Sequence, residues 1–167
     1  MKTGTSPEID LETFEVEDSD DLIALAKTLV DGNHPGILCT VDHEGAPRAR
    51  WMSTLDFHNF PVFYSLTAPG SRKVAQITEH PAVNWMFFER DRSLILNLIG
   101  KARVLTDVPT LKRVWQEVEE KSQTYFLDQF GKGPGFVVIE TTVESIECDA
   151  PPHGIRFKMH PAEFTRV

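Results

Sequence analysis

The feature that most constrains the fold is a series of short apolar segments separated by short turns. Gly, Asn and Pro form the turns, as in 43-HEGAP-47 and 58-HNFP-61, and connections of this kind join neighbouring antiparallel strands. The chain lacks the strand–helix alternation that a parallel sheet requires. The expected strands cover residues 36–42, 48–57, 62–68, 82–90, 93–107 and 136–149.

The remaining segments have helical or irregular patterns. Residues 93–107 are long for one strand, and Gly100 predicts a bend or a β-bulge within them. Apolar residues at a period of 3.6 predict helices that begin at Asp18 or Ser19, at Ser71 and at Val108. The second and third of these helices should cover residues 71–79 and 108–126, and the proline-rich tail beyond Ala150 has no clear pattern.

These elements predict one domain over residues 18–167, preceded by a flexible lead-in over residues 1–17. The expected fold class is mainly β with helices: a small antiparallel barrel with the helices packed outside it or at its ends. A chain of 167 residues is long enough for one domain with a sizeable core.

Charge and hydropathy exclude several partners. The formal net charge of −8 argues against nucleic acid and anionic membranes, which both attract basic surfaces. Apolar runs are too short to span a bilayer, and the polar N-terminus lacks the apolar region of a secretory signal. We therefore expect a cytoplasmic protein.

Cysteine and histidine residues give no indication of a disulfide or a metal site. Cys39 and Cys148 are far apart in sequence and form no CxxC pattern, so we interpret them as reduced thiols of a cytosolic protein. The six histidines are scattered, without the spacing of metal ligands.

A basic helix start is the first indication of function. In 68-APGSRKVAQITEHP-81, Arg72 and Lys73 directly follow Ser71 at the predicted start of a helix. Free backbone N–H groups and the positive end of the helix dipole lie there, so stability alone favours acidic residues. An anion explains the arrangement better, and phosphate suits N–H groups, a hydroxyl, an Arg fork and a Lys charge.

A second pair of cations lies on a predicted strand nearby. In 48-RARWM-52, alternation places Arg48 and Arg50 on one face and Trp51 on the other. Arg50 is then a further candidate for a bidentate phosphate contact. The alternative for both segments is an ordinary solvated surface, because a Ser-Arg-Lys triplet has many chance matches.

Three segments together resemble a known family. The segments 44-EGAPRARWMSTLDF-57, 61-PVFYSLTAPGSRKVAQITEHPAVNWMFF-88 and 99-IGKARVL-105 resemble the flavin-binding split barrels related to pyridoxamine 5'-phosphate oxidase, and most closely the general stress protein 26 group. The resemblance covers about residues 20–148. It implies a six-stranded antiparallel split barrel that forms a homodimer, with FMN at the interface.

The resemblance also implies a set of cofactor-binding residues. Arg50 matches the strand arginine that meets the FMN phosphate, and Ser71, Arg72 and Lys73 match the Ser-Arg-Lys phosphate grip. The positions that match flavin-lining residues are Trp51, Met52, Ser53, Thr54, Tyr64 and Ser65.

The chain departs from the oxidase pattern at three places. Leu55 replaces a lysine of the family, Ile95 replaces a glutamine, and the tail 153-HGIRFKMHP-161 lacks the Arg-x-His-Asp-Arg segment that helps to hold pyridoxal phosphate. The sequence therefore argues against pyridoxamine phosphate oxidation, while the FMN phosphate site is retained.

Two functions of different classes follow. The first is an FMN-dependent oxidoreductase-like stress protein with an unknown small-molecule substrate. The second is a module that stores, senses or sequesters flavin without efficient turnover. Related split barrels that bind F420 or haem are a third option, disfavoured by the acidic chain and by the lack of a well-placed axial histidine. No catalytic residue is identified from the sequence.

Overall fold

The fold is described by a computed structural model that covers most of the chain. The described residues are Leu29 and residues 35–55, 59–89, 94–118, 133, 135–151 and 154–164. The strands are β1 (Gly36–Val41), β2 (Pro47–Met52), β3 (Val62–Thr67), β4 (Ala82–Phe88), β5 (Ile95–Leu105), β6 (Val137–Ala150) and β7 (Ile155–Met159). The helices are α2 (Arg72–Glu79), α3 (Val108–Gln116) and α5 (Pro161–Phe164).

The strands form one antiparallel sheet with the order β2-β1-β4-β5-β6-β3, and β7 pairs with β6 outside this path. The prediction of a mainly β, antiparallel fold of the split-barrel type is confirmed. Leu55, just after β2, closes the path by pairing with Tyr64 of β3 through backbone N–H···O bonds of 2.7 and 3.0 Å. The predicted second strand reached Phe57, whereas β2 ends at Met52.

Strand pairing follows the chain order only in part. The pairs β1–β2, β4–β5, β5–β6 and β6–β7 join strands that are neighbours in sequence, and the turn at residues 43–47 correctly predicted the first of them. Contrary to the sequence prediction, the turn at residues 58–61 does not join a hairpin of β2 and β3. In contrast, β1 pairs with β4, and β3 pairs with β6. Strand β3 therefore leaves its neighbour β2 and joins the opposite end of the sheet.

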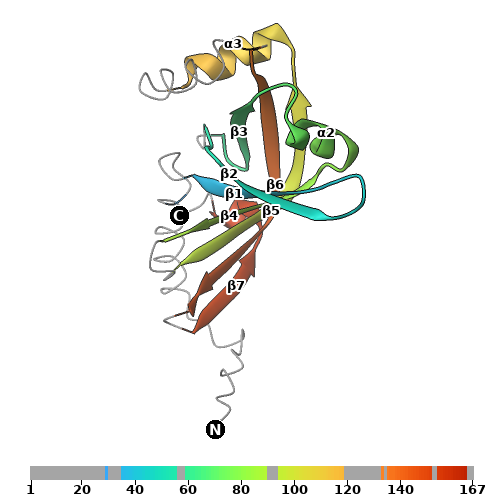
Figure 1. The fold of residues 1–167 in the computed structure, drawn as a ribbon. Helices are drawn as coiled ribbons and strands as arrows, with labels where there is room; N and C mark the ends of the chain where they lie inside the picture. Colours follow the sequence, from blue (N-terminus) through green and yellow to red (C-terminus); the bar gives the residue numbers. More distant parts are fainter. Residues whose placement is uncertain are drawn as a thin grey trace.

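The long strands β5 and β6 connect two ends of the molecule. In Figure 1, β3 and α3 lie towards one end of β6 and β7 lies at the other. The β5–β6 register shifts between Ile99 and Gly100, which confirms the predicted irregularity at Gly100. A Cβ atom on Gly100 would lie 2.0 Å from the Thr142 carbonyl oxygen, so only glycine fits at this register shift.

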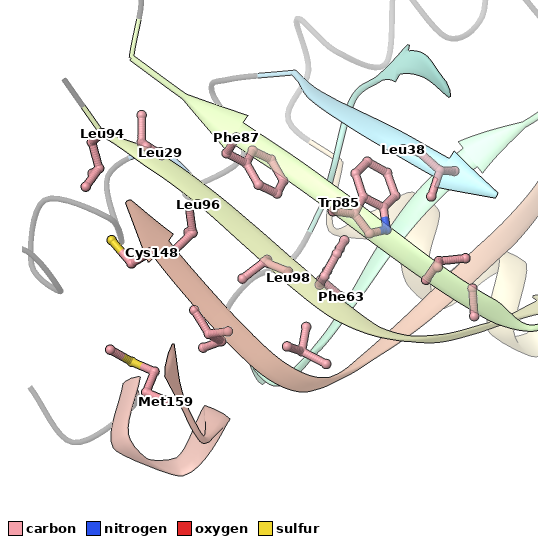
Figure 2. Packing of buried hydrophobic residues seen from close by; sticks show 14 of the residues in the cluster. Leu29, Leu38, Phe63, Trp85, Phe87, Leu94, Leu96, Leu98, Cys148 and Met159 are labelled. Atoms are coloured by element: carbon pink, nitrogen blue, oxygen red, sulfur yellow. The ribbon is translucent and has the colours of Figure 1, made fainter. Parts of the chain in front are cut away.

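The core fills the inner face of the barrel. Figure 2 shows Phe63 and Leu98 beside Trp85 near its centre, with Cys148 and Met159 farther along towards β7. The Phe63 and Trp85 rings meet edge to face at 5.3 Å, and Trp85 Nε1 donates to Thr141 Oγ1 at 3.2 Å. Trp85 and Phe87 are buried, as expected for core aromatics.

The helices cover the sheet and its ends. α2 packs on β1 and β5, and the range agrees with the predicted helix. α3 begins where expected, and the side chain of Asp107 caps it by accepting from Thr110 N at 3.0 Å. Among the described residues, no helix is long and apolar enough to cross a membrane.

Several sequence predictions fall outside the described residues. These are the lead-in over residues 1–17, the helix after Asp18 apart from the buried Leu29, and residues 119–126 of the third predicted helix. The prediction of one continuous helix over residues 108–126 is wrong, because α3 already ends at Gln116, with Glu117 as its C-cap. Strand β7 and helix α5 lie in the tail for which the sequence predicts no structure.

Candidate functional site

The site begins at the N-terminus of α2. Ser71 precedes the helix in an extended conformation, and its side chain makes no capping bond to the helix. The Ser71 hydroxyl lies instead 3.2 Å from Thr67 Oγ1. Because the first turn also has no acidic residue, its backbone N–H groups and the positive end of the helix dipole have no negative side chain to stabilise them.

Lys73 lies on the same side of the helix start as Thr67. Its Nζ donates to Thr67 Oγ1 at 2.9 Å, and the side chain is half-buried. Thr67 is the last residue of β3, so this contact ties α2 to the end of that strand. Two hydroxyls and an ammonium group therefore come together where the helix starts.

Arg50 reaches the same region from β2. Its guanidinium donates to the Leu38 carbonyl at 3.2 Å, to Thr40 Oγ1 at 2.7 Å and to Gln76 Oε1 at 3.1 Å. Gln76 is on α2, one turn beyond Lys73. The strand and the helix thus hold Arg50 on the inner face of β2, opposite Trp51, as the predicted alternation requires.

We call Arg50, Arg72 and Lys73 the cation cluster. Burial is the main cause that lowers the pKa of Lys73, and the positive charges of Arg50 and Arg72 lower it further. Burial also lowers the pKa of Arg50, and Arg72 contributes to this shift. The three charges are therefore close enough to repel one another.

The cation cluster has no carboxylate partner within the described part of the chain. Nearby Arg48 shows the usual arrangement, because its Nε donates to Asp42 Oδ2 at 2.7 Å. Three like charges without acidic partners are unfavourable for folding, and a multivalent anion would neutralise them. A phosphate group fits this donor set, because Arg, Lys, a Ser hydroxyl and helix N–H groups all donate to phosphate oxygens.

The other predicted flavin-lining residues of β2 and its continuation differ in exposure. Trp51 is 61% exposed on the outer face, with its ring centroid 5.9 Å from that of Phe88. Met52 is half-buried against the core, and Ser53 is exposed. Thr54 is buried, and its hydroxyl has no hydrogen-bond partner among the described residues.

Tyr64 and Ser65 are adjacent on β3 and face opposite sides. Ser65 is fully buried on the side of Thr67, and its hydroxyl has no partner in the described structure. Tyr64 packs in a second, smaller apolar cluster with Val114 and Val138, and its hydroxyl accepts from Arg113 Nη2 at 3.1 Å. Within one chain, Arg50, Ser71, Arg72 and Lys73 thus come together, whereas Tyr64 and Trp51 lie apart from them.

Three residues of this site were missed by the sequence analysis: Thr40, Thr67 and Gln76. Gln76 had a readable signal, since it follows Lys73 by three residues and therefore lies beside it on the predicted helix. Thr40 and Thr67 are ordinary strand residues in sequence, and only the tertiary arrangement brings them to the cations. No group of three His, Cys, Asp or Glu residues that could hold a metal occurs in the described ranges.

Comparison with known proteins identifies similar families and folds. Residues 22–148 match the family model of pyridoxamine 5'-phosphate oxidase. No curated protein matches the chain.

Solved structures with the same fold come from several bacteria. A protein of Clostridium acetobutylicum related to general stress protein 26 aligns with a TM-score of 0.72 at 16% identity, over 87% of this chain and 98% of the other. A pyridoxamine 5'-phosphate oxidase-related, FMN-binding protein of Nostoc punctiforme aligns with a TM-score of 0.63 at 15% identity, over 86% and 88%. A heme-binding protein of Mycobacterium smegmatis aligns with a TM-score of 0.67 at 13% identity, over 86% and 59%.

Proposed function

Because this chain belongs to the pyridoxamine 5'-phosphate oxidase family, we propose that the cation cluster binds the phosphate of FMN. The observation that carries the proposal is the convergence of Arg50, Arg72 and Lys73 at an acid-free helix start. A phosphate dianion offsets most of this charge, and the Ser71 hydroxyl adds a neutral donor. The FMN-binding relative of the same fold supports this choice of cofactor.

The residues of the chain would bind and orient the cofactor. Arg50, held by Thr40 and Gln76, provides a fixed guanidinium for the phosphate, and Lys73 provides a point charge held by Thr67. The segment after Arg50, residues 51–54, is then the candidate wall for the flavin ring. When bound, FMN supplies the electron-transfer chemistry, while the protein supplies orientation and electrostatics.

The proposed activity is that of an FMN-binding, oxidoreductase-like protein of the general stress protein 26 type, with a small-molecule substrate that is not a pyridoxamine phosphate. Leu55 and Ile95 take the places of a lysine and a glutamine of the oxidases. The same departures support the second candidate, a flavin-binding module without efficient turnover. Oxidation of NADH or NADPH by the FMN-loaded protein separates the two.

A homodimer is the proposed assembly. Trp51 is exposed on the outer face of β2, where the half-buried Ile37 pairs with it and with Met86 of β4. A second copy of the chain would bury this apolar surface. Sedimentation velocity of the wild type and of Trp51→Glu tests the assignment, since a charge at this position should shift a dimer towards monomer.

The first test of the cofactor is a titration of the apo protein with FMN, FAD, riboflavin and F420. FMN should bind far more tightly than riboflavin, which lacks the phosphate. The double variant Arg72→Ala/Lys73→Ala should weaken FMN binding by roughly 100-fold or more, because charge-assisted hydrogen bonds contribute about 1.5–3 kcal/mol each.

The matched control is Lys101→Ala/Arg103→Ala, which removes the same charge from exposed positions on β5. This control should leave FMN affinity almost unchanged. Equal affinity of the wild type for FMN and riboflavin, or equal losses in both double variants, would contradict the phosphate assignment.

A further inference from the structure

Arg50 of the cation cluster forms a closed ring of hydrogen bonds with Thr40 and Gln76. Thr40 Oγ1 donates to Gln76 Oε1 at 2.7 Å and accepts from Arg50 Nη1 at 2.7 Å. Arg50 Nη2 donates to the same Gln76 Oε1 at 3.1 Å. Each of the three side chains therefore contacts the other two, and they come from β1, β2 and α2.

The chemistry of arginine fixes the orientation of the ring. A guanidinium has only donors, so the Gln76 atom that faces Arg50 must be the amide oxygen. That oxygen also accepts from Thr40, so the Thr40 hydroxyl proton points to Gln76 and the Thr40 lone pairs point to Arg50. No other arrangement of these protons satisfies all three contacts.

The ring determines which Arg50 donors remain for a ligand. Nη1 donates to Leu38 O and Thr40 Oγ1, and one N–H of Nη2 donates to Gln76. Nε–H and the second N–H of Nη2 donate to no described residue. Among the five N–H groups of a guanidinium, Nε and Nη2 belong to the set that can grip an oxyanion in a bidentate manner.

Gln76 occupies a position where packing alone favours an apolar residue. It is buried like its neighbour Ile77 on the inner face of α2, and its exposed fraction is 9%. A buried amide is unfavourable unless it is hydrogen-bonded, and the ring provides those bonds. The amide nitrogen of Gln76 donates to no residue within the described ranges, so the oxygen carries the observed contacts.

We propose that Gln76 is a positioning residue that, together with Thr40, holds Arg50 so that its Nε–H and the second N–H of Nη2 face the phosphate of the bound cofactor. The inference rests on the proposed FMN function and adds a residue that does not itself need to contact the ligand. It also predicts that Thr40, which is 2% exposed, affects ligand binding through Arg50.

The test compares flavin affinities of the full-length apo protein by fluorescence titration at fixed ionic strength. The variants are Gln76→Met and Thr40→Val, which keep side-chain size and break the ring, and the controls are Thr40→Ser and Thr78→Val. Thr78 is an exposed residue of the same helix. The readout is the ratio of the riboflavin and FMN dissociation constants, which a general loss of structure does not change selectively.

Gln76→Met and Thr40→Val should each reduce this ratio by about tenfold, while both controls should stay within about twofold of the wild type. In an Arg50→Met background, Gln76→Met should have almost no further effect, because the residue that it positions is absent. Thermal unfolding of each apo variant verifies that it folds.

Three results would overturn the inference and leave the proposed function intact. An unchanged ratio in Gln76→Met shows that Arg50 needs no support, and a loss in Gln76→Met without one in Thr40→Val shows that Gln76 contacts the ligand directly. An undiminished effect of Gln76→Met in the Arg50→Met background has the same meaning. Equal binding of FMN and riboflavin by the wild type would instead overturn the proposed function and, with it, this inference.

Discussion

The barrel core and the cation cluster follow opposite rules of packing and charge, and they lie on different elements: Phe63 and Trp85 on β3 and β4, the cations on β2 and α2. In the core, Trp85 is fully buried against Phe63, and its only polar atom donates to Thr141. In the cation cluster, Arg50 and Lys73 are partly buried and repelled by Arg72. Residues that destabilise the fold are expected where a protein binds a ligand. The mutual repulsion of the three cations therefore marks their location as the candidate site.

The largest effect should come from the core. Trp85→Ala removes the central aromatic side chain and leaves Thr141 without its partner, so the free energy of unfolding should fall by about 4 kcal/mol. Urea denaturation measures the loss. Val108→Ala is the control, since Val108 is 59% exposed and lies outside the proposed interface and site, and it should change stability by only about 0.5 kcal/mol. Similar losses of unfolding free energy in both variants would contradict the assignment of Trp85 to the centre of the core.

The next largest loss of stability should come from the register shift between β5 and β6. Gly100→Ala would place a Cβ atom 2.0 Å from the backbone oxygen of Thr142. Because neither backbone can move without disturbing the register, unfolding stability should fall by about 3 kcal/mol. Gly70→Ala adds the same methyl group where nothing lies within 4 Å. If both variants melt at the same temperature as the wild type, the bulge does not require glycine.

In the cation cluster, by contrast, removal of a side chain should not lower the stability of the apo protein. Arg72→Ala removes an exposed charge that repels Arg50 and Lys73, so the apo protein should keep its stability or gain up to about 0.5 kcal/mol. FMN affinity should fall by about tenfold or more, because a charge-assisted contact is lost. Chemical denaturation with and without FMN measures both quantities. A clear loss of apo stability would assign Arg72 to the fold rather than to the ligand.

The smallest effect should come from Asp42, which pairs with Arg48 outside the cation cluster. Backbone N–H of Ala46 and the side chain of Arg48 are the leading causes that lower the pKa of Asp42. A carboxylate with a lowered pKa in the folded state stabilises the protein above about pH 4, and this contribution is lost as the pH falls through the folded-state pKa. The difference in melting temperature between wild type and Asp42→Asn should therefore narrow from pH 7 to pH 3.5. A constant difference over this range would contradict the pairing.

The sequence predicted the elements whose signals are local. Turns with Gly, Asn and Pro located six strands, five of them to within two residues at each end, and Gly100 located the register shift. The β2–β3 connection was less readable, because the bend after Met52 depends on the pairing of Leu55 with Tyr64 across the barrel. Strand β7 was missed because its short alternating run is stabilised by pairing with β6, a contact that no local pattern reveals.

The candidate site, like the fold, was predictable from the sequence only where its signals are local. Arg72 and Lys73 conflict with helix electrostatics, and such a conflict can be read directly from the sequence. The partners that hold the site, Thr40 and Thr67, come from strands distant in sequence, and their residue types are common in strands. Tyr64 and Ser65 match a family motif, but which side of β3 each one faces relative to the cations required the three-dimensional arrangement.

The edge of β6 is shared between two partners that never meet. β3 pairs with β6 as far as Thr142, and β7 pairs with it from Ile146 onward. The C-terminal strand therefore occupies a stretch of this edge that β3 does not use, so the backbone pairing of the strand that ends at Thr67 does not depend on hydrogen bonds to the tail. The two partners are linked through side chains instead, since Met159 of β7 and Phe63 of β3 belong to one core.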